Sequence, residues 1–578
     1  MTATTQDATA HPVARMAVLT VTALVIGALA SLAAIALVEV VSALNAGLLV
    51  SPRARVQWEQ TPRLVMVATV LVPTLGGLLV GLAHRYLSPA GRPLGPPDVI
   101  AAVQFRDPLP GLRSGLVSTA TAALSLGAGA SVGQYGPMVY LGALIGGAAR
   151  RLRVGVPNLP AIAISCGVAA AIATAFNAPV AGLVFAHEVV LRHYATQAFA
   201  PVTVASATGH VMANVIFDRP ALFLVEFGGV ENGHEFVLFG VLGILVALAA
   251  VGFMRLLLRV GQGLAVAPLP AALRPAAAGL AVGLTALWLP DVLGIGTETL
   301  RFATIEGAFG QGELVVLIAA KIVLTALCIG AGFSGGVFSP ALLIGSLIGA
   351  LFWSLAAGTA GVPTSGVAVY AIGGMMAFAS AVIGAPLTCI LIVFELTRNY
   401  DVTIAAMVAV VFSNLVAHRL FGRSLFDVQL RARGVDFSRG RDRARLAARK
   451  VVELAAQNAV TARTDENAEC VRQRLATHGW REAFVTDTHG RFAGVFTGDG
   501  DSGDTGPVRG RVRAPARVFD EHTDIAAAME RLRGFVGDAV PVVERETGRY
   551  LGAVAEADVV AAYLDESDRL RKEENAAL

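Results

Sequence analysis

The feature that most constrains this chain is a set of long segments without charged side chains. Residues 17–38 contain no charge, and roughly 20 apolar residues are enough to span the hydrocarbon core of a bilayer. Comparable runs follow at 64–82, 162–176, 236–254, 314–329 and 404–415, interrupted by a charge only at Lys321. The first run is too long for the apolar part of a secretory signal, and many others follow it. We therefore predict a helical protein that crosses a membrane many times.

The composition excludes a single soluble core. Of the 578 residues, 55% are hydrophobic and 15% are charged, whereas soluble domains carry about 25% charged residues. The net charge of +3 comes without the long basic blocks that indicate nucleic-acid binding. The four cysteines show no paired or metal-ligand spacing, so we predict neither a disulfide framework nor a metal site; they are Cys166, Cys328, Cys389 and Cys470.

A change in composition after about Phe421 divides the chain. Basic residues gather directly behind the last apolar run, at Arg431, Arg433, Arg439, Arg441, Arg443, Arg445, Arg449 and Lys450. The positive-inside rule places this cluster, and the region after it, in the cytoplasm. Arg53, Arg55 and Arg63 favour the opposite orientation if the loop after the first run is external. We expect a tail at 1–15, a membrane domain at 16–434, a basic linker at 435–455 and a soluble region at 456–578.

Gly and Pro interrupt the apolar segments at 133–137, 177–179, 332–340 and 384–386. Broken helices are tolerated in lipid only where protein or a water-filled cavity surrounds the freed backbone groups. Residues 177–188 also resemble residues 384–395, since each has a small residue, Ala-Pro, an apolar run and a final Glu. Matching breaks in two halves predict a repeat-built transporter with its substrate site at the repeat interface. The alternative is coincidence between two apolar helices that begin at proline.

The soluble region contains two similar α/β units, at about 456–500 and 512–565, with a Gly- and Asp-rich linker at 498–510. Each has a helix, at 468–478 and 525–533, and then two short strand patterns.

Two Gly-rich turns carry the predicted binding chemistry. Residues 126–137 lead into a helix at 138–147, and residues 332–340 lead into one at 341–351. The first N–H groups of a helix are unsatisfied and lie at the positive end of its dipole, so each turn is an anion site without a basic side chain. Partial charges suit a permeant anion, because a full charge would trap it. The alternative is close helix packing by small residues.

These segments resemble the signature motifs of the CLC family of chloride channels and chloride/proton antiporters. Gly133–Pro137 is similar to the family's Gly-Lys/Arg-Glu-Gly-Pro, and Gly336–Pro340 is similar to its Gly-x-Phe-x-Pro. Asn177–Gly182, Lys321–Ala326 and Arg431–Gly434 also fit, and the soluble region resembles the paired CBS domains of many members.

The resemblance implies an all-α polytopic membrane domain of two inverted halves with broken helices, followed by a cytoplasmic α/β CBS pair. It also implies a homodimer in the cell membrane with a separate pore in each subunit. Helix N-termini would converge on a chloride pathway, and the expected anion-binding residues are Gly95, Gly133, Gln134, Tyr135, Gly136, Gly336, Val337, Phe338 and Phe426.

Four positions depart from the family pattern. The gating glutamate falls on Tyr135, and the glutamate that relays protons in the antiporters falls on Val189. The tyrosine ligand of the central anion falls on Phe426, and the serine of the first motif falls near Leu94. Tyrosine ionises only near pH ~10 and valine does not ionise. We therefore expect passive conduction with Tyr135 as a neutral plug or a hydroxyl ligand; the alternative is that Tyr135 swings out and only packs.

The sequence thus predicts a transport protein for chloride or a similar small anion, and no enzyme. One rival is a proton-coupled antiporter that uses His187 or Glu188; a second is a membrane anion sensor with little flux. His187 can also be a histidine satisfied at a helix end or a subunit contact. The anion stays open among chloride, nitrate, bromide, fluoride and bicarbonate.

Three residues of the soluble region point to a regulatory ligand. Thr497, Asp499 and Asp558 lie where CBS pairs place the groups that hold an adenosine ribose, although the usual Ser/Thr-x-x-Asp spacing is intact at neither aspartate. An adenine nucleotide is the expected ligand, and a purely structural dimer module is the alternative. We expect no other cofactor.

Overall fold

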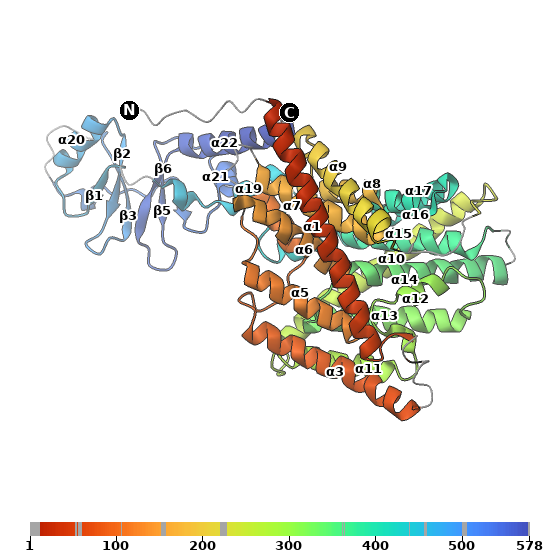
Figure 1. The fold of residues 1–578 in the computed structure, drawn as a ribbon. Helices are drawn as coiled ribbons and strands as arrows, with labels where there is room; N and C mark the ends of the chain where they lie inside the picture. Colours follow the sequence, from red (N-terminus) through yellow and green to blue (C-terminus); the bar gives the residue numbers. More distant parts are fainter. Residues whose placement is uncertain are drawn as a thin grey trace. The chain divides into compact units, whose positions relative to one another are not determined.

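The computed structural model describes residues 12–52, 55, 61–105, 107–151, 158–219, 228–360, 362, 364–438, 440–455, 459–499 and 506–575. The chain folds into two compact units, one that ends at Leu430 and one that comprises Arg431–Asn575. The first is built from helices, and the second contains helices and strands (Figure 1).

The first unit confirms the prediction of many membrane-crossing helices. Eight helical segments of the described chain are long and apolar enough to cross a bilayer, and together they contain all six predicted apolar runs. Its helices are α1 (Pro12–Gly47), α3 (Pro62–Tyr86), α4 (Pro96–Phe105), α5 (Leu112–Gly127), α6 (Tyr135–Gly147), α7 (Leu159–Phe176), α8 (Pro179–Phe185), α9 (Thr196–His210), α10 (Glu235–Val266), α11 (Arg274–Thr285), α12 (Thr297–Phe302), α13 (Gln311–Ala331), α14 (Phe338–Trp353), α15 (Val367–Ile383), α16 (Pro386–Thr397), α17 (Tyr400–Leu420) and α18 (Leu425–Arg431).

Two stretches of this unit repeat the same backbone geometry. Asn177 ends α7 in the left-handed conformation with φ 55°, and Gly384 ends α15 with φ 72°. A proline then opens the next helix in each stretch, α8 and α16. After α8 and a π-helical turn the chain reaches Arg192 at φ 59°, and after α16 it reaches Arg398 at φ 52°. The predicted sequence similarity between residues 177–188 and 384–395 is therefore accompanied by the same backbone geometry.

Glycines bring the helices of each half to backbone contact. A Cβ at Gly142 of α6 would stand 2.3 Å from the carbonyl oxygen of Gly167 on α7. A Cβ at Gly349 of α14 would stand 2.1 Å from the carbonyl oxygen of Tyr370 on α15. Such contacts are typical of small residues in packed membrane helices. Small residues in the middle of α6 and α14 therefore serve close helix packing. Of these two helices, only the N-termini are candidates for anion binding.

The second unit contains the two predicted α/β units. Its sheets have the orders β1-β2-β3 and β4-β5-β6, and in each sheet the first pair is parallel and the second antiparallel. The elements are α19 (Arg441–Ala448), β1 (Thr461–Arg463), α20 (Ala468–His478), β2 (Glu482–Thr486), β3 (Phe492–Thr497), β4 (Phe519–Asp520), α21 (Ile525–Arg531), β5 (Val540–Val543), β6 (Tyr550–Val554) and α22 (Glu556–Asn575).

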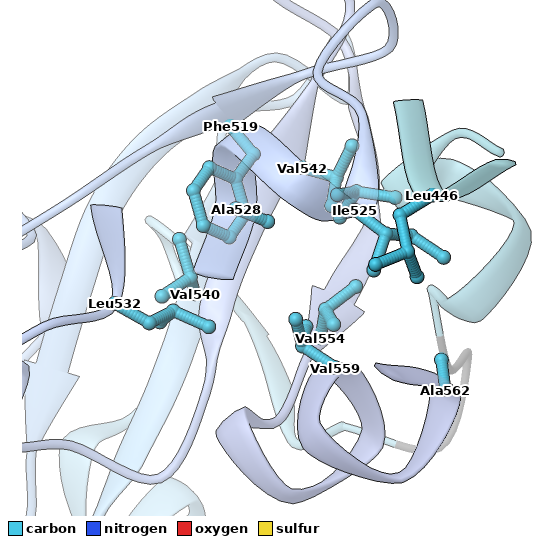
Figure 2. Packing of buried hydrophobic residues seen from close by; sticks show 11 residues of the cluster. Leu446, Phe519, Ile525, Ala528, Leu532, Val540, Val542, Val554, Val559 and Ala562 are labelled. Atoms are coloured by element: carbon cyan, nitrogen blue, oxygen red, sulfur yellow. The ribbon is translucent and has the colours of Figure 1, made fainter. Parts of the chain in front are cut away.

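The core of the second sheet extends into the segment predicted as a basic linker. Figure 2 shows Leu446 of α19 among the buried residues of this core, near Ile525 and Val542. Arg445 of α19 also forms an ion pair with Glu566 of α22, with an N–O distance of 3.1 Å and both side chains less than a tenth exposed. Part of the predicted linker is therefore a folded helix, because α19 contributes both apolar and ionic contacts to this unit.

The first sheet is completed differently from the second. Within the described residues, no helix follows β3 in the way that α22 follows β6. Instead Val508 enters the core of the first sheet, and the backbone of Arg513 pairs with that of Val495 at N–O distances of 2.8 and 2.9 Å. The predicted linker at 498–510 thus includes packed residues, while its residues 500–505 lie outside the described part.

Candidate functional site

The two Gly-rich turns meet in the structure. The N–H of Gly133, just before α6, donates to the carbonyl oxygen of Gly336, just before α14, and the N–H of Gly336 donates to the carbonyl oxygen of Gly133. Both N–O distances are 2.7 Å. A Cβ at Gly133 would stand 2.8 Å from the Gly336 oxygen, so this approach requires glycine. This pair of hydrogen bonds, here called the glycine bridge, places the starts of α6 and α14 next to each other.

The glycine bridge decides which backbone amides an anion can use. Both glycine N–H groups are consumed by it, and the N–H of Gln134 donates to the Ser339 hydroxyl at 3.1 Å. Among the described residues, no hydrogen bond engages the next amides at the two helix starts, those of Tyr135, Gly136, Val337 and Phe338. An anion here would meet these four N–H groups at the positive ends of two helices.

A small cavity lies at these helix starts. It has a volume of about 20 Å³, which is close to the space needed by a single water molecule. Its lining includes six of the predicted anion-binding residues, namely Tyr135, Gly136, Gly336, Val337, Phe338 and Phe426.

Tyr135 lies between this cavity and a much larger one. The larger cavity, of about 870 Å³, is lined by the C-terminal part of α1, by Gln134 and Asn177, and by residues between Pro290 and Phe302; Tyr135 lines both cavities. Its ring stacks on Phe176 with centroids 4.2 Å apart and meets Phe338 edge-on at 5.4 Å. The side chain is 5% exposed. No sequence motif marks Phe176, because its contact with Tyr135 arises only where the end of α7 meets the start of α6.

The helix that carries Phe426 is anchored by charge. Ser424 caps α18 by accepting a hydrogen bond from the N–H of Asp427 at 3.2 Å, and Arg192 pairs with Asp427 at 2.7 Å. Arg192 follows the π-helical turn that contains Val189. The segment that contains Val189 thus holds α18 in place, while Phe426 itself offers the cavity only its ring.

The start of α4 is closed by a carboxylate. The N–H of Gly95 donates to Asp98 at 3.0 Å, and Asp98 also pairs with Arg92 at 2.5 Å. The N–H of Leu94 donates to the Ser118 hydroxyl at 2.9 Å. Gly95 was predicted as an anion donor, but its amide already has an anionic partner. An acidic residue three positions after the cap is the sequence signal of such an arrangement.

Glu188 and Glu395 cap helices of opposite halves reciprocally. The carboxylate of Glu188, beyond α8, accepts from the N–H groups of Leu387 and Thr388 at the start of α16, at 3.0 and 2.9 Å. The carboxylate of Glu395, on α16, accepts from the N–H groups of Val180 and Ala181 at the start of α8, at 2.9 and 2.8 Å. The echoed glutamates therefore close the starts of both helices.

Val189 and His187 are both buried on the π-helical turn. The Nδ1–H of His187 donates to the carbonyl oxygen of His193 at 2.8 Å, and the imidazole stacks on Tyr194 at 5.3 Å. Its Nε2 has no partner among the described residues. His187 is thus a helix-end histidine with one unused nitrogen.

The residues predicted to bind a nucleotide lie in the second unit, on β3, directly after it and on α22. Thr497 ends β3, Asp499 follows it, and Asp558 is exposed in the first turn of α22. Burial, together with the charges of Asp538 and Asp499, raises the pKa of Glu482. Asp499 therefore lies near other carboxylates. No cluster of metal-binding side chains occurs among the residues that the structure describes.

Comparison with known proteins identifies the membrane unit. A family model described as a voltage-gated chloride channel matches residues 76–418, which contain both Gly-rich turns and both capping glutamates. The chain belongs to the CLC family. A CBS-domain model matches residues 510–565, the second α/β unit. The resemblance of the sequence motifs to CLC proteins with a CBS region is confirmed.

Relatives of this CLC protein include channels and exchangers by name. A putative chloride channel protein ClcB-like of Ralstonia nicotianae is 33% identical over 66% of this chain and 87% of the relative. An H(+)/Cl(-) exchange transporter ClcA of Cronobacter sakazakii is 28% identical over 70% of this chain and 87% of the relative. The solved structure of a slow cyanobacterial Cl-/H+ antiporter is also similar, with a TM-score of 0.63 and 25% sequence identity. The similarity covers 74% of this chain and 99% of the antiporter chain. Family membership therefore leaves both passive and proton-coupled transport open.

Proposed function

We propose that this CLC protein conducts chloride or a similar small anion passively, with Tyr135 as a neutral plug. The observation that carries the proposal is the position of Tyr135 between the two cavities, stacked on Phe176 and edge-on to Phe338. A phenol remains neutral at working pH. It therefore neither repels a permeant anion nor exchanges a proton when the anion passes. Opening would require motion of the ring alone.

Proton coupling needs a titratable relay, and the positions that supply it in the resembling antiporters hold Tyr135 and Val189. Glu188, next to Val189, is committed to the start of α16 by three hydrogen bonds. The second candidate function is a proton-coupled exchanger that uses His187, favoured by its unpartnered Nε2. A third, an anion sensor without substantial flux, remains as the alternative to both.

We also propose a homodimer whose shared face includes α8 and α16. Val180, Leu387 and Phe394 are exposed on these helices, beside the half-buried carboxylates of Glu188 and Glu395. Carboxylates facing lipid are costly, and a second copy would cover them. For the second unit we propose a cytoplasmic, regulatory CBS role, with an adenine nucleotide at Thr497, Asp499 and Asp558 as its candidate ligand.

The deciding experiment uses purified protein in chloride-loaded liposomes, with valinomycin to set the voltage. Chloride efflux and external pH are recorded together. Passive conduction predicts chloride efflux without proton movement, and no uphill proton transport driven by a chloride gradient. Protons that move in fixed ratio to chloride would overturn the proposal, and a loss of that coupling in His187→Gln would assign the relay to His187. An absence of chloride, nitrate, bromide and fluoride flux in preparations of folded protein would favour the sensor.

A further inference from the structure

A third cavity lies at the far ends of the helices that build the anion site. It has a volume of about 430 Å³. Among the described residues, its wall is mostly apolar and includes Leu109, Leu144 and Ile164, and the charged residues that line it are Asp107, Arg150 and Arg151. None of these residues belongs to the chloride pathway described above.

The charge at this cavity favours an anion. Arg150 and Arg151 are exposed and directly follow α6 in a 3₁₀ turn. Within the described residues neither of them pairs with Asp107, so the three charges leave a net positive lining. The helices α5 and α7 begin at the cavity with Gly111 and Asn158 as N-caps, and within the described residues neither N-cap side chain accepts a hydrogen bond from the first turn of its helix. Two helix N-termini therefore add to the two guanidinium groups.

The apolar wall identifies the class of anion. A soluble phosphate needs only the basic groups, whereas a phospholipid also needs a surface for its acyl chain. Basic pockets between membrane helices are suited to anionic lipid headgroups. We propose that this cavity binds an anionic phospholipid, with its phosphate at Arg150 and Arg151 and its chain along the wall formed by Leu109, Leu144 and Ile164.

The position of the cavity connects the lipid to the plug. The helix α6 begins with Tyr135 and ends at the cavity, while α7 begins at the cavity and ends with Phe176, on which Tyr135 stacks. The helix α4 likewise has Pro96 at the anion cavity and Ala102 at the lipid cavity. A lipid that shifts these ends would change the contact between Tyr135 and Phe176. This regulatory step rests on the proposed function, whereas lipid binding does not.

Binding is tested first, because it does not depend on flux. The full chain is purified in detergent with phosphatidylglycerol, and retained lipid is measured by native mass spectrometry. We expect retention by the wild type, loss in Arg150→Ala/Arg151→Ala, and retention in Arg259→Ala/Arg419→Ala, which removes two exposed arginines outside the cavity. Ala161→Phe, which fills the cavity without changing its charge, should also lose the lipid. Equal retention in all four proteins would overturn the proposal.

Two further arms separate the lipid from other sources of phosphate. Excess inorganic phosphate should leave the lipid bound to the wild type. If phosphate displaces the lipid, the site recognises the phosphate group alone and the proposal fails. In liposomes, replacing phosphatidylcholine by phosphatidylglycerol should change chloride flux several-fold in the wild type and not in the Arg150/Arg151 variant. The same response in both proteins would exclude regulation through this cavity, whatever the transport mechanism.

Discussion

At the scale of single residues, the proposed role of Tyr135 is to close the anion pathway without a charge. A carboxylate in this place would compete with the permeant anion for the same N–H groups, and protonation would release it. The Tyr135 ring is instead held by Phe176 and Phe338, and aromatic contacts of this kind contribute about 0.5–1.5 kcal/mol each. In the proposed function, the closed state would therefore be weakly favoured and independent of pH near neutrality.

Removing the ring should open the pathway. In Tyr135→Ala both aromatic contacts are lost, which is about 1–3 kcal/mol in total. Since each ~1.4 kcal/mol corresponds to a factor of ten, we expect chloride efflux from liposomes to rise about 5- to 100-fold. Tyr135→Phe keeps the contacts but loses the O–H donor, so its efflux should stay low while its preference among chloride, bromide and nitrate changes. Tyr86→Ala, at an exposed tyrosine outside both cavities, is the control. Unchanged efflux and selectivity in both Tyr135 variants would refute the plug.

The glycine bridge gives a second prediction at this scale. In Gly133→Ala the new methyl group would stand 2.8 Å from the Gly336 oxygen and 2.8 Å from the Ser339 hydroxyl, and overpacking of this kind costs about 1–3 kcal/mol. We expect a lower thermal unfolding temperature in detergent together with reduced chloride flux. Gly263→Ala, where nothing lies within 4 Å of the added atom, should unfold like the wild type. A Gly133→Ala protein as stable as this control would mean that the bridge can separate freely.

At the scale of helices, the fold sorts its N-termini by what caps them. Carboxylates close α4, α8 and α16, through Asp98, Glu395 and Glu188. The starts of α6 and α14 keep amides without partners among the described residues. An N-terminus whose amides are already occupied cannot bind a mobile anion, so the starts of α6 and α14 are available to the proposed pathway, whereas those of α4, α8 and α16 are not.

The reciprocal caps should stabilise the two halves jointly. Glu188→Ala and Glu395→Ala each uncap a helix in the other half, and loss of such a cap costs about 0.5–2 kcal/mol. We expect each to lower the unfolding temperature of the whole membrane unit, and Glu188→Gln to do so less. Glu313→Ala removes an exposed carboxylate that faces only the start of its own helix, α13, and serves as the control. Equal unfolding temperatures in all variants would show that the caps do not hold the halves together.

In the second unit, Glu482 predicts a dependence of stability on pH. Burial and the charges of Asp538 and Asp499 raise its folded-state pKa, so the ionised carboxylate is destabilising above that pKa and the penalty disappears as the pH falls through it. Glu482→Gln should therefore stabilise this unit at neutral pH, by less than about 1 kcal/mol for a half-exposed group, and the gain should shrink in acid. Urea unfolding at several pH values measures it, with Glu546→Gln, at an exposed carboxylate, as the control. A gain that grows in acid would reverse the assignment.

At the scale of the molecule, the membrane unit consists of two halves joined at their centre. The glycine bridge connects the two Gly-rich turns, and the reciprocal glutamates connect α8 with α16. Both connections relate equivalent elements of the two halves. A pathway at such an interface is shaped by both halves at once, and the proposed anion pathway at the starts of α6 and α14 has this property.

The proposed homodimer is tested by changing its apolar face. Phe394→Lys places a charge on an exposed position of α16, and it should convert the dimer to monomers in detergent, as measured by light scattering. Leu75→Lys, at an exposed position on α3, should leave the dimer intact. If each subunit has its own pore, Phe394→Lys monomers should still conduct chloride once reconstituted. A stable dimer in Phe394→Lys would place the shared face elsewhere.

The sequence by itself determined the membrane-crossing helices, the two Gly-rich turns and the paired α/β units, because these depend on local properties. Apolar length decides whether a segment can cross a bilayer, and a glycine followed by a helix creates an N-terminus with free amides. Tertiary structure alone decided that Gly133 and Gly336 consume each other's amides, that Phe176 supports Tyr135, and that Leu446 belongs to a folded core. Each of these facts is a contact between residues that are distant in the chain. The local sequence around a backbone N–H group is the same whether the group binds an anion or another backbone group, so the sequence cannot reveal its partner.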